Sequence, residues 1–238
     1  MLAMVKCDFI STKSYLLQIV PIAILIAFFV WIGTGQLVSG IAAVAAMLPF
    51  MYIFSITAYD ELNGWERFRL TLPMSRRQIT LGRYVSVLLV VIASDVLMLA
   101  FTGIAYLIAL LFPQFPATEA LLSSFSLGTE VGHAILVSSV MLIMAALSVP
   151  LFVRFGVTKG ARLVPLVMVV ILVGVLYAIG DADEAVMQAI PFLETLLVPS
   201  ADEVWMSLAM SGIVFAVAFV VYVLSALLSA KLYEKRQF

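Results

Sequence analysis

Residues 204–230 read VWMSLAMSGIVFAVAFVVYVLSALLSA and contain no charged side chain. An α-helix rises about 1.5 Å per residue, so about 20 apolar residues in a helix cross the hydrocarbon core of a bilayer. This stretch is long enough to do so with some tilt. It predicts that the chain is embedded in a membrane.

The composition of the whole chain agrees with this prediction. Of the 238 residues, 64% are hydrophobic and 11% are charged, and the mean hydropathy is +1.19. Soluble globular domains contain about 45–50% apolar and about 25% charged residues. A chain this short cannot bury such an excess of apolar side chains in a core, because small domains expose much of their surface. The net charge of −1 argues against a nucleic-acid partner, which requires a basic face.

Five further apolar stretches have a similar length. We therefore expect an all-α integral membrane protein, a single transmembrane domain over residues 1–238 with membrane lipid around it. The six transmembrane helices are expected at residues 15–32, 37–59, 84–112, 131–153, 163–180 and 204–230.

The basic residues predict the orientation of these spans. All 13 Lys and Arg residues lie in the N-terminal tail, the second and fourth connections or the C-terminal tail. The three remaining connections carry only acidic charges. Since cytoplasmic loops are rich in Lys and Arg, both termini are expected in the cytoplasm. Residues 1–14 then form a cytoplasmic amphipathic tail, and residues 181–203, which mix acidic and apolar side chains, form a loop at the outer interface.

Most of the charge of the second connection lies in residues 60–78, which read DELNGWERFRLTLPMSRRQ. On a helical projection Leu62, Trp65, Phe68 and Leu72 share one arc, whereas polar side chains occupy the other. This pattern predicts an amphipathic helix that lies on the membrane surface, with Trp65 at the depth of the headgroups.

Pro73 is expected to end this helix, because the residue before a proline avoids the helical region. Ser75 and Gln78 have the spacing of a capping box, which predicts that the next helix begins here. Leu70 projects on the side that faces water. The segment is either a solvated loop or a docking element, and the exposed leucine favours docking.

The same residues resemble the permease subunits of ABC-2 exporters. The matching residues are YDE at 59–61, GWE at 64–66, LPMSRRQI at 72–79 and RY at 83–84. A similar pattern occurs between the second and third helices of the bacterial single-domain branch of that family. The resemblance implies a bacterial inner or plasma membrane protein that exports substrates such as peptides or antimicrobial compounds.

The resemblance also implies partners and site residues. Two permease subunits, identical or different, would pair above two separate ABC ATPase subunits, and these would bind ATP and Mg²⁺. This chain would then hold no cofactor and catalyse no reaction. Residues 60–78 would be the coupling helix that contacts the ATPase, and its candidate contact residues are Asp60, Glu61, Trp65, Glu66, Arg67, Phe68, Leu70 and Pro73.

No phosphate-binding loop of the form G-x-x-x-x-G-K-[S/T] is present in the sequence. Residues 156–160 read GVTKG, which has a different spacing. Any ATP hydrolysis that drives this chain is therefore expected in another polypeptide.

Asp95 is the only ionisable residue deep within an expected span. Such a carboxylate is a candidate functional group. Ser138 and Ser139 fall at a comparable depth in the fourth span, so a protonated Asp95 hydrogen-bonded to a neighbouring hydroxyl is the alternative. We favour the structural role because no expected span contains a cation.

Two other classes of protein share some of these features. A substrate-binding membrane subunit of a vitamin importer also has six helices, but it docks its ATPase without an amphipathic loop. An intramembrane enzyme that binds a metal requires several inward histidines, whereas His133 is the only histidine here. The single cysteine, Cys7, excludes a disulfide within the chain and a cysteine-based metal cluster.

Overall fold

The computed structural model describes residues 2–34, 37–62, 75–115, 118–119, 121–122, 125–180 and 204–235. These parts of the chain are almost entirely helical and contain no strand. The expected all-α class is therefore confirmed for them. The long helices are α1 (Leu2–Thr34), α2 (Leu37–Leu62), α4 (Arg76–Leu111), α6 (Leu127–Gly180) and α9 (Val204–Lys235).

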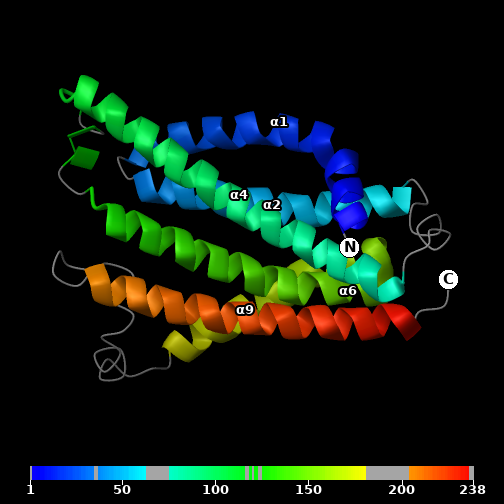
Figure 1. Cartoon of the computed structure of the whole chain (residues 1–238). Coiled ribbons are helices and arrows are strands. Elements are labelled where there is room, and N and C mark those ends of the chain that lie inside the picture. The colour runs from blue at the N-terminus through cyan, green and yellow to red at the C-terminus, as the bar shows by residue number, and fades with distance from the viewer. Residues whose placement is uncertain are drawn as a thin grey trace.

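These helices lie side by side as a bundle (Figure 1). The start of α1, the end of α2, the start of α4 and the end of α9 all lie at one end of the bundle, which we call the junction end. The starts of α6 and α9 lie at the opposite end. The helices described thus alternate in direction along the chain, as successive spans of a membrane protein do.

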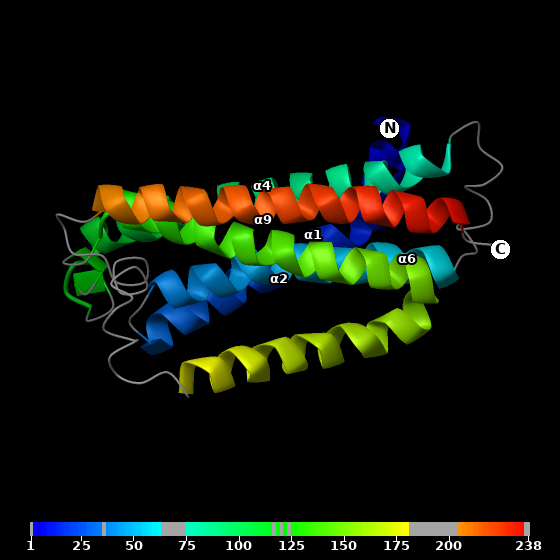
Figure 2. The same ribbon diagram turned by 90° about the horizontal axis from the view of Figure 1, so that it is seen from below.

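The helix α6 consists of two parts that meet at Gly156. This residue has φ 76° and ψ 173°, a conformation that is essentially restricted to glycine. Beyond it the chain turns back, and residues 157–180 run toward the opposite end of the bundle (Figure 2). The expected fourth and fifth spans correspond to these two parts of α6.

Among the described residues, four helices are long and apolar enough to cross a membrane. They are Leu2–Gly33, Arg76–Leu111, Leu127–Gly156 and Val204–Glu234. The apolar part of α2, Val44–Asp60, is shorter. The multi-pass membrane character is therefore established, whereas the count of six spans and the side on which the termini lie remain predictions.

The predicted N-terminal tail is not separate from the first span, since α1 is continuous from Leu2. It bends near its N-terminal end (Figure 1). The predicted outer loop 181–203 lies outside the described residues.

The core lies between α2, α4, α6 and α9. Tyr52 and Ile56 of α2, Val87 and Val91 of α4, and Leu142 of α6 belong to one cluster of buried side chains. The outer surfaces of α1, α4 and α9 carry many exposed large apolar side chains. This arrangement suits a bundle surrounded by lipid, where apolar side chains face outward at little cost.

Candidate functional site

The beginning of α4 has the structure that the sequence predicts. The Ser75 hydroxyl accepts a hydrogen bond from the Gln78 backbone N–H at 3.2 Å. The Gln78 side-chain oxygen accepts one from the Ser75 backbone N–H, also at 3.2 Å. This reciprocal capping box confirms the predicted helix start. The connection that follows α2 is thus attached to α4 by a well-capped first turn.

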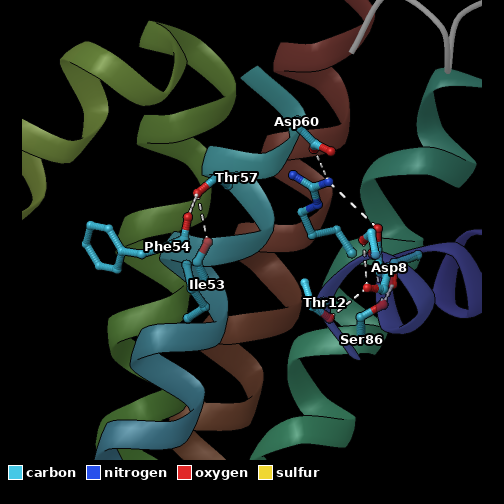
Figure 3. Close-up of polar contacts among 10 residues, drawn as sticks. Asp8, Thr12, Ile53, Phe54, Thr57, Asp60 and Ser86 are labelled. Atoms are coloured by element: carbon cyan, nitrogen blue, oxygen red, sulfur yellow. Dashed lines mark hydrogen bonds and ion pairs between the residues drawn. The ribbon is translucent and has the colours of Figure 1, made fainter. Parts of the chain in front are cut away.

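Three charged side chains from three helices meet near this turn, and we call them the Arg83 ion cluster. The guanidinium of Arg83 on α4 forms an ion pair with Asp60 near the end of α2. Its Nη2 lies 3.8 Å from Oδ1 of Asp8 on α1. Figure 3 shows Asp60 and Asp8 pointing toward the same cation from opposite sides. The cluster therefore joins α1, α2 and α4.

Asp8 is held by several groups besides Arg83. Its side chain is fully buried, and the Ser86 hydroxyl on α4 donates to Oδ2 at 3.1 Å. The Thr12 hydroxyl donates to the Asp8 backbone carbonyl at 2.8 Å. Thr57, although near the cluster in Figure 3, donates to carbonyls of its own helix. A carboxylate removed from water needs such partners, because an unpaired buried charge is costly.

Because the cluster is buried, the loss of any one of its charged side chains is expected to destabilise the protein. The side chains of Arg83 and Asp60 are each 13% exposed, and that of Asp8 is 0% exposed. Removal of one partner from a buried ion pair costs about 3–5 kcal/mol, because the other partner is left without compensation. We therefore expect α1, α2 and α4 to move together at this end of the bundle.

Tyr84, the next residue on α4, bonds to a different set of helices. Its hydroxyl lies 2.9 Å from the Ser225 Oγ and 2.8 Å from the Ser229 Oγ, both on α9. The Tyr222 hydroxyl donates to the Tyr84 backbone carbonyl at 2.6 Å, and the two tyrosine rings pack with centroids 4.9 Å apart. Ser225 donates in turn to the Ala146 carbonyl of α6 at 2.6 Å.

Arg83 and Tyr84 together with these partners form what we call the α4 junction. Through Arg83 the junction reaches α1 and α2, and through Tyr84 it reaches α9 and α6. Arg76 adds one more link, since its Nη1 donates to the Glu234 carbonyl near the end of α9 at 3.1 Å. Two adjacent residues of α4 therefore connect all five long helices that the structure describes.

The structure places only part of the predicted coupling site. Asp60 lies in the Arg83 ion cluster, and Glu61 belongs to the last turn of α2. The other predicted contact residues lie outside the described residues. They are Trp65, Glu66, Arg67, Phe68, Leu70 and Pro73.

Asp95 has the polar neighbour that its depth predicts. The Ser138 hydroxyl of α6 donates to Asp95 Oδ2. Ser139 is not part of this contact, because its hydroxyl donates to the Ile135 carbonyl of its own helix at 2.7 Å. The other carboxylate oxygen, Oδ1, is buried without a hydrogen-bond partner among the described residues. The contact supports a structural role for Asp95, which stays a prediction.

Two buried acidic residues were missed as site candidates by the sequence analysis. Asp8 belongs to the predicted amphipathic N-terminal tail, and the structure makes it the most buried member of the ion cluster. Glu130 lies in the first turn of α6, is 4% exposed, and stands just before the expected fourth span. Its position at a helix N-terminus, where the backbone dipole favours a negative charge, is the signal that identifies it.

Comparison with known proteins assigns the family. The family model of the ABC-2 family transporter protein matches residues 3–234. No curated protein and no solved structure matches the chain. Because the family match covers nearly the whole sequence, the chain belongs to the ABC-2 family of transporter membrane proteins.

Proposed function

We propose that this chain is the permease subunit of a bacterial ABC-2 exporter and works only as part of a larger complex. A second permease subunit, either another copy or a homologue, would complete the substrate pathway. Separate ABC ATPase subunits would supply the energy from the cytoplasm. Family membership and the multi-pass helical bundle support this proposal.

The α4 junction is the observation that carries the mechanism. Residues 60–78 connect Asp60, at the end of α2, with the Ser75 cap, at the start of α4. A force applied to this segment would act on both helices at once. Arg83 lies about two turns inside α4 and pairs with Asp60, so the same force would be passed to α1. The Tyr84 hydrogen bonds would pass it to α9 and α6.

The ATPase contact is proposed for the water-facing side of residues 60–72. Leu70 would insert into a groove of the ATPase, and the charges of Glu66 and Arg67 beside it would set the register of docking. Burial of one leucine side chain contributes about 2–3 kcal/mol. Trp65 and Phe68 would hold the opposite side of the helix at the membrane surface.

The substrate is proposed to be a peptide or an antimicrobial compound that leaves the cell. This part of the proposal rests on the resemblance to small exporter permeases. Uptake and export are distinguished by inside-out vesicles that contain the purified complex. An exporter accumulates labelled substrate inside such vesicles when ATP is added outside, whereas an importer does not.

Purification of the tagged chain from its native host tests the division of labour. We expect an ABC ATPase and a second permease subunit to co-purify, and ATP hydrolysis to be lost when the ATPase is washed away. Sustained ATP hydrolysis by the chain without an associated ATPase would contradict the proposal. Mass spectrometry of the eluate identifies the partners and also decides between a homodimer and a heterodimer.

A further inference from the structure

An apolar groove of about 460 Å³ runs along the N-terminal half of α1. Every described residue that lines it belongs to α1. Phe9, Leu16 and Val20 are partly buried there and pack against the core of the bundle. Leu17, in contrast, is 66% exposed. The groove is therefore open to the surroundings along a helix that is apolar enough to lie in a membrane.

Lys13 is the one charged side chain among the described residues that line this groove. It is exposed, and no ion pair or hydrogen bond joins it to another residue of the described chain. The nearest acid on α1, Asp8, is fully buried and is engaged by Arg83 and Ser86. The ammonium group of Lys13 is thus left without a counter-charge from its own helix.

Lys13 and the apolar residues that follow it are arranged so that they could contact the headgroup and the acyl chain of one lipid. Lys13 lies two residues before the expected first span at residues 15–32, hence at the level of the headgroups. A lysine at this level extends its methylene stem along apolar surface and presents its charge to the interface. The apolar lining of Leu16, Val20 and Pro21 follows it toward the membrane interior.

We propose that the groove and Lys13 form a binding site for an anionic phospholipid. One acyl chain lies in the groove, and the lipid phosphate pairs with the Lys13 ammonium. The volume of the groove lies in the range of about 300–1,000 Å³ that small-molecule sites occupy. An acyl chain fills an apolar groove in the hydrocarbon region without leaving polar groups unpaired, as water there would.

A second copy of the chain is a poorer fit for this groove. A two-fold contact uses the same patch of both subunits. It would bring two Lys13 ammonium groups into one interface, and the described lining offers no acid to either of them. A single anionic phosphate balances the charge, whereas the two lysines repel each other.

Native mass spectrometry of the full-length chain in detergent tests the site. The chain is titrated with phosphatidylglycerol or with phosphatidylcholine, and the dissociation constant of the first bound lipid is measured. One lysine at a membrane surface favours an anionic lipid by about fivefold. The wild type should therefore prefer phosphatidylglycerol by about this factor, and Lys13→Gln should remove the preference.

Matched variants separate this site from unspecific attraction. Lys13→Arg keeps the charge and should keep the preference. Lys231→Gln removes an exposed lysine of α9 and should also leave the preference unchanged. A preference that survives Lys13→Gln, or that Lys231→Gln abolishes equally, would overturn the headgroup assignment.

The acyl-chain part of the site has its own tests. Leu17→Trp fills the open side of the groove and should weaken binding of both lipids, because both carry acyl chains. Undiminished binding of both lipids to this variant would overturn the groove assignment. Leu17→Cys, in a chain with Cys7→Ser, should not form a disulfide-linked dimer in membranes. Efficient formation of that dimer would show that a second copy covers the groove instead.

Discussion

Loss of Arg83 should destabilise the junction end of the bundle more than any exposed substitution nearby. Arg83→Gln removes the guanidinium that pairs with Asp8, which is 0% exposed, and with Asp60, which is 13% exposed. Removal of one partner from a buried ion pair costs about 3–5 kcal/mol. We expect the free energy of unfolding to fall by about this amount.

The matched control is Arg77→Gln, an exposed arginine six positions earlier on the same helix. Substitutions of exposed residues without special contacts stay within about 0.5 kcal/mol. A double-mutant cycle with Asp60→Asn isolates the ion pair. Asp60→Asn should cost less in the Arg83→Gln background than in the wild type, with a coupling energy of about 0.5–3 kcal/mol.

Unfolding of the purified chain in detergent by titration with sodium dodecyl sulfate, followed by far-ultraviolet circular dichroism, provides the measurement. Equal free energies of unfolding for Arg83→Gln and Arg77→Gln would refute the structural reasoning. The reconstituted complex adds a functional readout. Because Arg83 itself lies outside the proposed docking segment at residues 60–72, Arg83→Gln should still bind the ATPase while substrate transport is lost.

Three further predictions concern other parts of the chain. Gly156→Ala should cost about 1–3 kcal/mol in detergent unfolding, because its φ of 76° is strained for alanine. Gly103→Ala should not destabilise, because no neighbouring atom of the described residues lies within 4 Å of the added methyl group. Asp95→Asn should keep expression and transport, since an amide still bonds to the neighbouring hydroxyl, and loss of transport in a well-expressed variant would assign Asp95 a functional role. In a chain without its native cysteine, a cysteine at Asp183 should react with an impermeant maleimide in intact cells and one at Asn63 should not, whereas labelling at Asn63 would overturn the topology.

Local features of the sequence predict local features of the structure well. The Ser75 and Gln78 spacing predicts the capping box, because both hydrogen bonds are formed within one helical turn. The break between the fourth and fifth spans is found at Gly156, inside the polar connection that hydropathy predicts. The glycine-only backbone conformation there was not predicted, since spacing alone does not report dihedral angles.

The depth of a residue within a span can be predicted from the sequence. The direction in which its side chain points around the helix axis is harder to predict. The expected third and fourth spans place Asp95 at a depth comparable to that of Ser138 and Ser139. The structure pairs Asp95 with Ser138, because adjacent residues of a helix point about 100° apart. Which of the two serines pairs with Asp95 depends on how α6 is rotated about its axis relative to α4. The sequence of one helix alone does not specify that rotation.

The Arg83 ion cluster shows the limit of hydropathy most clearly. Hydropathy assigns charged residues near the ends of apolar stretches to the region outside the membrane core, so it predicts that Asp8 lies in an amphipathic cytoplasmic tail. In the structure its charge is compensated by Arg83, which lies 75 positions later in the sequence. Such pairing depends on how three helices pack, and the periodicity of one helix carries no information about it.

We propose that residues 60–78 pass the action of an ATPase to the bundle, and the affinity of the ATPase for a Leu70→Asp variant decides whether they do. A tagged ATPase is used to capture the wild type, Leu70→Asp and a control, Leu70→Met, which keeps an apolar side chain of similar volume and should bind like the wild type. We expect Leu70→Asp to insert and fold normally but to bind about 30- to 150-fold more weakly, the factor that corresponds to one buried leucine. Normal ATPase binding and normal transport by Leu70→Asp would contradict the account.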